Sequence, residues 1–228
     1  MSRTAPLVLL AALALCLVVA CGSSARTVVS LRHAQSSHTL HRAASELERQ
    51  RGVQGTRSDL GSAEIEVEYD PDEVRPDDLV RRARAAGYDV VLGPGQGSYA
   101  ERKTAFPDEV DVATISRAGE EVKLEQHLAA GKITVFDFYA DWCEPCVIID
   151  QELLSIVTRH GDVAVRKVNV VDWDTPVAAR YLSRVPELPY LIVYAPDGRR
   201  VASLSGVRVP ALRKAIAQAR GGKLAEAP

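Results

Sequence analysis

The sequence predicts two consecutive domains, an α+β domain followed by an α/β domain. Strand and helix patterns alternate twice between residues 26 and 93. A glycine-rich stretch, residues 93–98, then interrupts both patterns. After it, an apolar strand pattern over residues 133–139 leads directly into a helical pattern that begins at two cysteines. The 208 residues that would follow a 20-residue leader are enough to bury two small cores.

The N-terminus has the pattern of an export signal. Arg3 precedes an apolar run over residues 7–20 that is short for a membrane span but typical of a secretory signal. The run ends with small Ala20 before Cys21, which resembles a bacterial lipoprotein signal. The resemblance implies a signal peptide over residues 1–20 and a lipid on Cys21. A plain signal peptide or an uncleaved anchor are the alternatives, and all three place the folded part outside the cytoplasm.

The four cysteines, Cys16, Cys21, Cys143 and Cys146, support that placement. On the lipoprotein reading one leaves with the signal and one takes the lipid, so only the Cys143/Cys146 pair remains. The mature chain must then be held together by its cores rather than by structural disulfides. The formal net charge of −2 and the pI near 6.2 give no argument for binding to nucleic acid.

Residues 26–93 form the first predicted domain. Its expected elements alternate between apolar strands and amphipathic helices, and the second helix stops at Gly87. They are a strand at 27–31, a helix at 37–50, strands at 53–57 and 63–69, a helix at 78–86 and a strand at 88–92. Strand, helix, strand, strand, helix, strand is the ferredoxin-like βαββαβ order.

This segment resembles the heavy-metal-associated domain of copper chaperones and metal-transporting ATPases. The resemblance rests on Gly52-Val53, on Val67-Glu68-Tyr69-Asp70-Pro71 and on Ala85-Ala86-Gly87-Tyr88. The two metal-binding cysteines of that family fall on Ser36 and Thr39. Hydroxyl groups are poor ligands for Cu(I), so the metal function of the family does not carry over.

Three histidines, His33, His38 and His41, lie around the same loop and the start of its helix. Imidazoles bind Cu(II) or Zn(II), and His38 and His41 are three residues apart on one helical face. Histidines in a polar loop are more often ordinary surface residues. We therefore assign no metal site and keep these three only as candidates; the alternative is a degenerate domain retained for docking or spacing.

The second predicted domain covers residues 108–221, after a flexible linker at 94–107 and before a tail at 222–228. Its expected elements follow the same two periodicities. They are a strand at 110–115, a helix near 122–130, a strand at 133–139, a helix from the cysteine pair, a strand at 163–171, a short helix within 172–182, strands at 190–194 and 200–204, and a helix at 209–219.

The two cysteines sit at the start of that central helix. A two-residue gap places Cys143 at the helix start and Cys146 one turn later, so a disulfide closes with little backbone movement. The positive end of the helix favours a thiolate on Cys143 and lowers its pKa. Cys143 should therefore attack a disulfide, and Cys146 should resolve the mixed disulfide that forms. The alternatives are half of a zinc site and a structural disulfide. A zinc site would need two further ligands at suitable spacing, and the only histidines nearby in sequence, His127 and His160, each stand alone.

From residue 110 to residue 217 the sequence resembles the thioredoxin superfamily, on the motif Trp142-Cys143-Glu144-Pro145-Cys146. The resemblance implies a thioredoxin fold and assigns further site residues. Asp137 falls at the buried carboxylate that relays a proton to the second cysteine, Lys167 at the lysine near it, and Pro189 at the cis-proline that faces the disulfide. A strand carboxylate without a chemical role and an ordinary loop proline are the alternatives for Asp137 and Pro189.

One position departs from typical thioredoxins: Glu144 stands where they have glycine. Cys-Glu-Pro-Cys resembles the membrane-anchored thiol reductases of cytochrome c maturation, and Tyr139-Ala140-Asp141-Trp142-Cys143 resembles the periplasmic domain of the transmembrane thiol reductant conduit. A carboxylate beside Cys143 disfavours the thiolate and makes the pair a stronger reductant. Glu144 is equally explained as an acid that complements the helix dipole.

The sequence therefore predicts a lipid-anchored thiol:disulfide oxidoreductase of the bacterial cell envelope, which reduces disulfides of exported proteins. Its expected partners are disulfide-containing envelope proteins and a membrane thiol donor, and no cofactor signature is present. One alternative is a metal-handling accessory protein whose second domain keeps metal-site cysteines reduced. The other is a redox-inactive scaffold, against which the intact cysteine pair argues.

Overall fold

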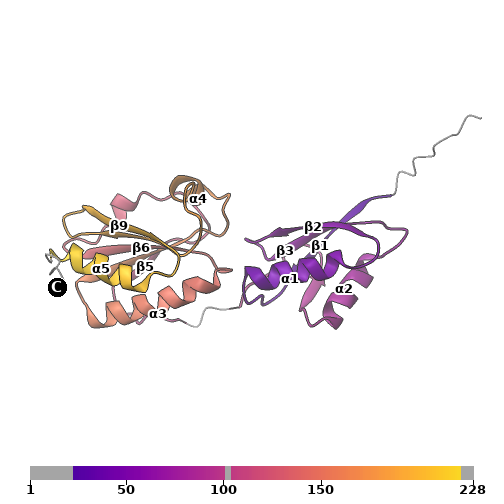
Figure 1. Ribbon diagram of the computed structural model, residues 1–228, viewed down its shortest axis with the longest axis horizontal. Helices are drawn as coiled ribbons and strands as arrows, with labels where there is room; N and C mark the ends of the chain where they lie inside the picture. Colours follow the sequence, from indigo (N-terminus) through magenta and orange to yellow (C-terminus); the bar gives the residue numbers. More distant parts are fainter. Residues whose placement is uncertain (1–22, 101–103, 222–228) are drawn as a thin grey trace, which may run out of the picture.

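The computed structural model describes residues 23–100 and 104–221, which form two domains along the long axis of the molecule (Figure 1). The predicted signal peptide, the predicted lipidation site Cys21 and the predicted tail lie outside the described residues. Among the residues that are described, no helix has the length and apolar character needed to cross a membrane.

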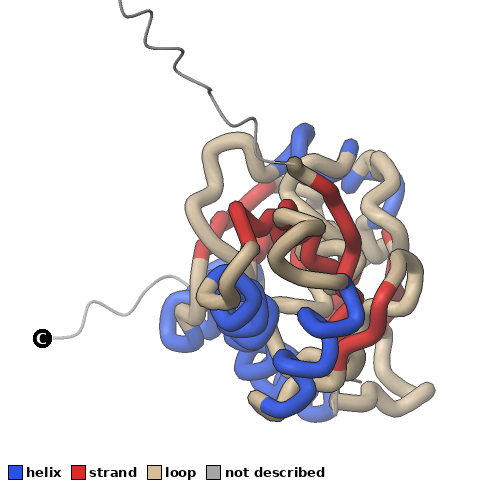
Figure 2. The backbone as a smooth tube through the Cα atoms, turned by 90° about the vertical axis from the view of Figure 1, so that its right-hand side faces the viewer, coloured by secondary structure: helices blue, strands red, loops and turns tan. Residues whose placement is uncertain are grey.

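The N-terminal domain has the ferredoxin-like order that its sequence predicts. Its elements are β1 (Ala25–Leu31), α1 (Ser37–Glu48), β2 (Val53–Asp59), β3 (Glu64–Tyr69), α2 (Pro76–Ala85) and β4 (Val90–Leu92). The sheet has the strand order β2-β3-β1-β4, and every neighbouring pair is antiparallel. Each helix thus crosses over the sheet, and both helices cover one face of it, as Figures 1 and 2 show from two directions.

Alternation along β3 explains this arrangement. Ile65, Val67 and Tyr69 point into the core, whereas the glutamates between them are partly exposed. The helices supply a matching apolar face, because their buried positions recur at helical spacing. Those positions are Leu40, Ala43, Ala44 and Leu47 in α1, and Leu79, Val80 and Ala83 in α2.

The C-terminal domain has a thioredoxin fold. Its elements are β5 (Val112–Ser116), the 3₁₀ helix η1 (Leu124–His127), β6 (Ile133–Tyr139), α3 (Glu144–Arg159), β7 (Val163–Asn169), α4 (Pro176–Tyr181), β8 (Tyr190–Tyr194), β9 (Arg200–Ser205) and α5 (Val209–Ala219). The strand order is β5-β7-β6-β8-β9. The first three strands are parallel, and β8 and β9 are antiparallel to their neighbours.

Strand β6 lies at the centre of this sheet, and only Tyr139 among its residues is not fully buried. Both faces are covered, which explains its nearly continuous apolar sequence. Ile133 and Val135 pack with α3 and α5, whereas Phe136 and Phe138 pack with α4 on the other side (Figure 1). By the same alternation Asp137 belongs to the face that α3 covers.

One predicted helix is shorter in the structure. The helix expected near residues 122–130 is only the four residues of η1, because Leu128 is extended and the Ala129 N–H is donated to the Thr134 hydroxyl. The short helix predicted within residues 172–182, after a loop, is confirmed as α4, which starts at Pro176. Thr175 before it is extended, as the residue preceding a proline usually is.

The glycine-rich segment was predicted to be flexible, and this prediction is wrong for its C-terminal half. Ser98 donates its N–H to the Leu31 carbonyl and accepts the N–H of Ala34, and Ala34 forms a parallel bridge with Tyr99. The chain is held against the end of β1 by backbone groups, which composition does not reveal. A Cβ on Gly97 would lie 2.0 Å from the Ser62 carbonyl oxygen, so only glycine fits this approach.

We predict that Gly97→Ala destabilises the N-terminal domain by about 1–3 kcal/mol, because the added methyl group forces the backbone segment away from its partner. Gly55→Ala is the matched control, since a Cβ there meets no atom within 4 Å. Thermal unfolding followed by circular dichroism measures both. Equal midpoints for the two variants would show that the segment is not held as described.

Candidate active site

The cysteine pair forms a disulfide at the N-terminal end of α3. Cys143 is the N-cap residue and Cys146 lies in the first turn, with 5.4 Å between their Cα atoms. The backbone N–H of Cys146 points at the Cys143 sulfur, 3.2 Å away. This N–H has no partner inside the helix, and together with the helix dipole it favours negative charge on that sulfur. The geometry thus suits a thiolate at Cys143 after reduction.

Two tryptophans adjoin the pair. The Trp142 indole N–H donates to the Val171 carbonyl at 2.6 Å, which fixes the residue before Cys143. Trp173 lies beside it, with the ring centroids 6.0 Å apart, and this residue is 37% exposed. Sequence reasoning missed Trp173. Its signal was an indole placed between two aspartates in a polar loop, where burial does not explain it.

The proline predicted to face the disulfide follows a cis peptide bond, Leu188-Pro189. The Pro189 carbonyl accepts the Gly206 N–H at 2.9 Å, which ties this loop to the end of β9. Leu188 and Cys143 line the same cavity of about 350 Å³. The loop before β8 therefore lies beside Cys143, as the resemblance to thioredoxins implies.

Beneath the disulfide, Lys167 on β7 forms a buried ion pair with Asp137 on β6. The two residues are direct neighbours in the parallel pairing of these strands. The Lys167 ammonium donates to the Asp137 carboxylate at 2.7 Å, and both side chains are less than one tenth exposed. Every predicted site residue of the C-terminal domain therefore lies at or directly under the end of α3.

Sequence reasoning missed a second carboxylate. Asp150 of α3 is buried and accepts a hydrogen bond from the same Lys167 ammonium. It lies four residues after Cys146, and residues four apart share one helical face. The sequence could have indicated this pair, because an aspartate on the apolar face of α3 needs a buried cation as its partner.

The cluster of Asp137, Asp150 and Lys167 contains two acids and one base. Burial alone would lower the pKa of Lys167, but the two carboxylates outweigh it and raise the pKa above its usual value. The ammonium also lies over the Tyr139 ring, 4.4 Å from its centroid. With the lysine charged, the cluster carries one net negative charge, and Asp150 lies one helical turn after Cys146. A carboxylate held in this way is a chemical group that can accept a proton.

The three histidine candidates do not come together in the part of the chain that the structure describes. Among residues 23–100 and 104–221, no group of three or more histidine, cysteine, aspartate or glutamate side chains is placed to hold a metal ion. His33, His38 and His41 are therefore not gathered by the fold. His38 instead lines the cavity that contains Cys143.

Comparison with known proteins agrees with this geometry. The thioredoxin family model matches residues 116–218. Thioredoxin-2 of Saccharomyces cerevisiae is 35% identical over 91 residues, which are 40% of this chain and 84% of the yeast protein. The chain belongs to the thioredoxin family. Thioredoxin AMT13 of Alternaria alternata is 31% identical over 86 residues, which are 38% of this chain and 70% of that protein. The family and the intact disulfide together indicate a thiol:disulfide oxidoreductase.

The N-terminal domain falls outside that match. Oxidized MerP from Ralstonia metallidurans is a solved structure that aligns with 31% of this chain and 97% of its own length, at 14% identity and a TM-score of 0.29. The strand order β2-β3-β1-β4 makes the N-terminal domain ferredoxin-like.

We predict that Lys167→Met lowers the free energy of unfolding by about 3–5 kcal/mol, because two buried carboxylates lose their cation. The loss should be smaller at pH 5 than at pH 8, since a stranded carboxylate is neutralised by taking up a proton. Lys132→Met is the matched control: its partner Asp111 is partly exposed, so about 1 kcal/mol or less is expected. Urea unfolding at both pH values measures the effect; equal losses for the two variants would contradict it.

The raised pKa of Lys167 also limits the stability of the fold at alkaline pH. A group with a folded pKa above its unfolded value of about 10.5 stabilises the fold fully below that pH and loses its contribution as the pH rises through the folded pKa. Urea unfolding of the unmodified protein should thus show a loss of stability above about pH 10.5 that Lys167→Met lacks. The same alkaline loss in both proteins would assign it to other groups.

Proposed function

We propose that this protein is a thiol:disulfide reductase of the bacterial cell envelope, which acts on disulfides of exported proteins. One observation carries the proposal: a thioredoxin-family domain holds the Cys143–Cys146 disulfide at the start of α3, next to a cis-proline loop. The buried acid pair and the exposed Trp173 beside the cleft supply proton transfer and an apolar contact for a substrate.

In the reduced protein the Cys143 thiolate attacks one sulfur of a substrate disulfide. The substrate S–S bond breaks, a mixed disulfide forms, and the released substrate sulfur takes up a proton. Cys146 then transfers its proton to the carboxylate cluster of Asp137 and attacks the Cys143 sulfur. The second substrate thiol leaves, the substrate has gained two electrons, and the protein is left with the disulfide seen here. A dithiol of the membrane is the proposed donor that restores it.

Glu144 supports the reducing direction. It is exposed in the first turn of α3, directly after Cys143. Its negative charge opposes a thiolate on the neighbouring sulfur, and a dithiol whose thiolate is less stabilised gives up its electrons more readily. The same carboxylate interacts favourably with the positive end of the helix, so the two effects share one side chain.

The place of action is proposed from the N-terminal sequence. The small-residue ending before Cys21 supports a lipid anchor, and the cysteine usage supports an oxidising compartment outside the cytoplasm. An anchored reductase would have its electron donor within reach in the same membrane. Exported proteins with disulfides are then the substrates, and nucleic acid is not among the partners.

The reduction potential of the Cys143/Cys146 couple tests the direction. Equilibration with a thioredoxin standard should give a value near or below about −270 mV, and a value near about −120 mV would make the protein an oxidant instead. Cys146→Ser should accumulate the mixed disulfide with a short disulfide-containing peptide, whereas Cys143→Ser should form none, because only Cys143 attacks. Non-reducing mass spectrometry distinguishes the two variants; equal trapping by both would contradict the assignment.

The anchor has its own test. We predict that in bacterial cells Cys21→Ser moves the protein from the membrane fraction to the soluble fraction of the envelope and abolishes incorporation of a labelled fatty acid, because a thioether-linked lipid requires the sulfur. Cys16→Ser is the control and should retain both properties. Labelling that persists in Cys21→Ser would place the lipid elsewhere, and a membrane-bound but unlabelled Cys21→Ser would indicate an uncleaved apolar anchor.

A further inference from the structure

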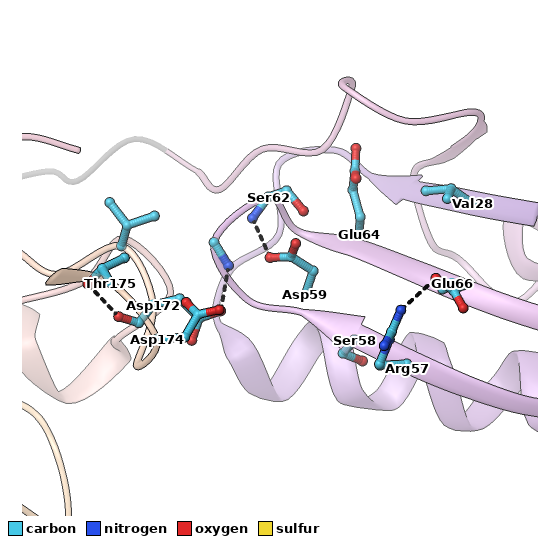
Figure 3. Close-up of a pocket in the computed structure, with 12 residues that line it drawn as sticks. Val28, Arg57, Ser58, Asp59, Ser62, Glu64, Glu66, Asp172, Asp174 and Thr175 are labelled. Carbon is cyan, nitrogen blue, oxygen red and sulfur yellow. Dashed lines mark hydrogen bonds and ion pairs between the residues drawn. The ribbon is translucent and has the colours of Figure 1, made fainter. Parts of the chain in front are cut away.

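The N-terminal domain packs on the end of the thioredoxin domain that carries the disulfide. Figure 1 shows the N-terminal ends of α1 and α3 facing one another across the junction. The backbone N–H of Ser37 donates to the Trp142 carbonyl at 3.0 Å, and the N–H of Gly61 donates to the Asp172 carboxylate at 3.1 Å (Figure 3). The two domains are thus joined at two points, one at the residue before Cys143 and one at Asp172.

Apolar contact continues between these points. Leu60 and Tyr99 pack both on the core of the N-terminal domain and on the cluster that contains Trp142. The Tyr99 hydroxyl donates to the Leu60 carbonyl at 2.8 Å, and this hydrogen bond holds the two residues together. Hydrogen bonds and apolar burial therefore hold the same face.

This docking leaves one cavity beside the redox pair. It has about 350 Å³ and takes its walls from both domains. The thioredoxin domain supplies Trp142, Cys143, Glu144, Trp173 and Leu188; the N-terminal domain supplies Ser36, Ser37 and His38. Cys143 is only 3% exposed within this enclosure. A cavity of this size admits a small molecule or a short extended peptide but not the surface of a folded protein.

We propose that the N-terminal domain selects the substrates of the Cys143–Cys146 pair: while its loop at residues 33–38 stays on Trp142, the pair reacts with low-molecular-weight disulfides and with extended segments, and disulfides of folded proteins are excluded. This inference rests on the proposed reductase function and adds the substrate class. The chemical step is unchanged. The attacking sulfur, the leaving sulfur and the two electrons are those of the exchange described above, and the domain governs only which disulfide reaches Cys143.

The contact with Trp142 depends on the backbone N–H of Ser37. This serine is the first helical residue of α1, where a backbone N–H has no partner within the helix. That N–H is donated instead to the residue directly before Cys143. The preceding Ser36 is extended, with φ −168° and ψ 173°. The helix itself does not need this hydrogen bond, so the bond can be removed without unfolding α1.

Ser37→Pro removes this donor alone. Proline is favoured at the first helical position, and the extended Ser36 suits the residue before a proline. Ser37→Ala is the matched control, because it removes the hydroxyl and keeps the N–H. Gly61→Leu weakens the second contact independently, since a Cβ at Gly61 would lie 3.1 Å from the Val171 side chain. Circular dichroism checks that all variants are folded.

The full chain is reduced, freed of reductant and mixed with oxidised glutathione or with native insulin, and oxidation of the Cys143 peptide is followed by mass spectrometry. Ser37→Pro and Gly61→Leu should each oxidise with insulin about fivefold faster than Ser37→Ala and the unmodified protein, the size expected for one hydrogen bond. The rates with glutathione should change less than twofold.

Each other result has a defined meaning. Insulin rates that are unchanged or lower in both variants would overturn substrate selection by the N-terminal domain, while activity toward glutathione would leave the reductase function standing. An increase of equal size with both probes would also overturn it, because access in general rather than substrate class would then be controlled. No oxidation by either probe in any folded protein would overturn the reductase function itself.

Discussion

The buried ammonium of Lys167 joins the three elements on which the active site depends. It binds Asp137 of β6 and Asp150 of α3 while it is itself part of β7, so the central strands and the redox helix share one charged contact. A charge buried this deeply is tolerated only when it is paired, which fixes how α3 sits on the sheet. The position of Cys146, one turn before Asp150, follows from that constraint.

The fold could be predicted wherever one local pattern decided the structure. Alternation along β3 and the apolar run of β6 gave their strands, because burial on one face or on two faces produces these patterns. Boundaries were missed where a tertiary contact decided them. The helix around η1 is cut short by the Thr134 hydroxyl, which lies on the next strand and takes the Ala129 N–H. No property of the helix sequence alone contains that information.

The site residues also divide into those that the sequence indicates and those that only tertiary contacts reveal. Spacing around the cysteine motif was enough to find Asp137, Lys167 and Pro189, because the resemblance fixes their order along the chain. Asp150 was missed because it lies on α3 and its partner Lys167 lies on β7. The ion pair between them becomes visible only when the fold brings Lys167 between two acids. The junction was also hidden. A segment rich in glycine reads as flexible, but Ser98 and Tyr99 are ordered by partners that exist only in the folded domain.

The junction separates access to the redox pair from the chemistry of the pair. Helix α3 begins directly after Cys143, so the partial positive charge at its N-terminal end, about half a unit, acts on a thiolate at that sulfur, whereas Glu144 adds a negative charge beside it. The first N–H of α1 is donated to the Trp142 carbonyl instead, and this contact places Ser36, Ser37 and His38 in the wall of the cleft. The thioredoxin domain therefore sets how readily the pair gives up its electrons, and the N-terminal domain sets which disulfide can reach it.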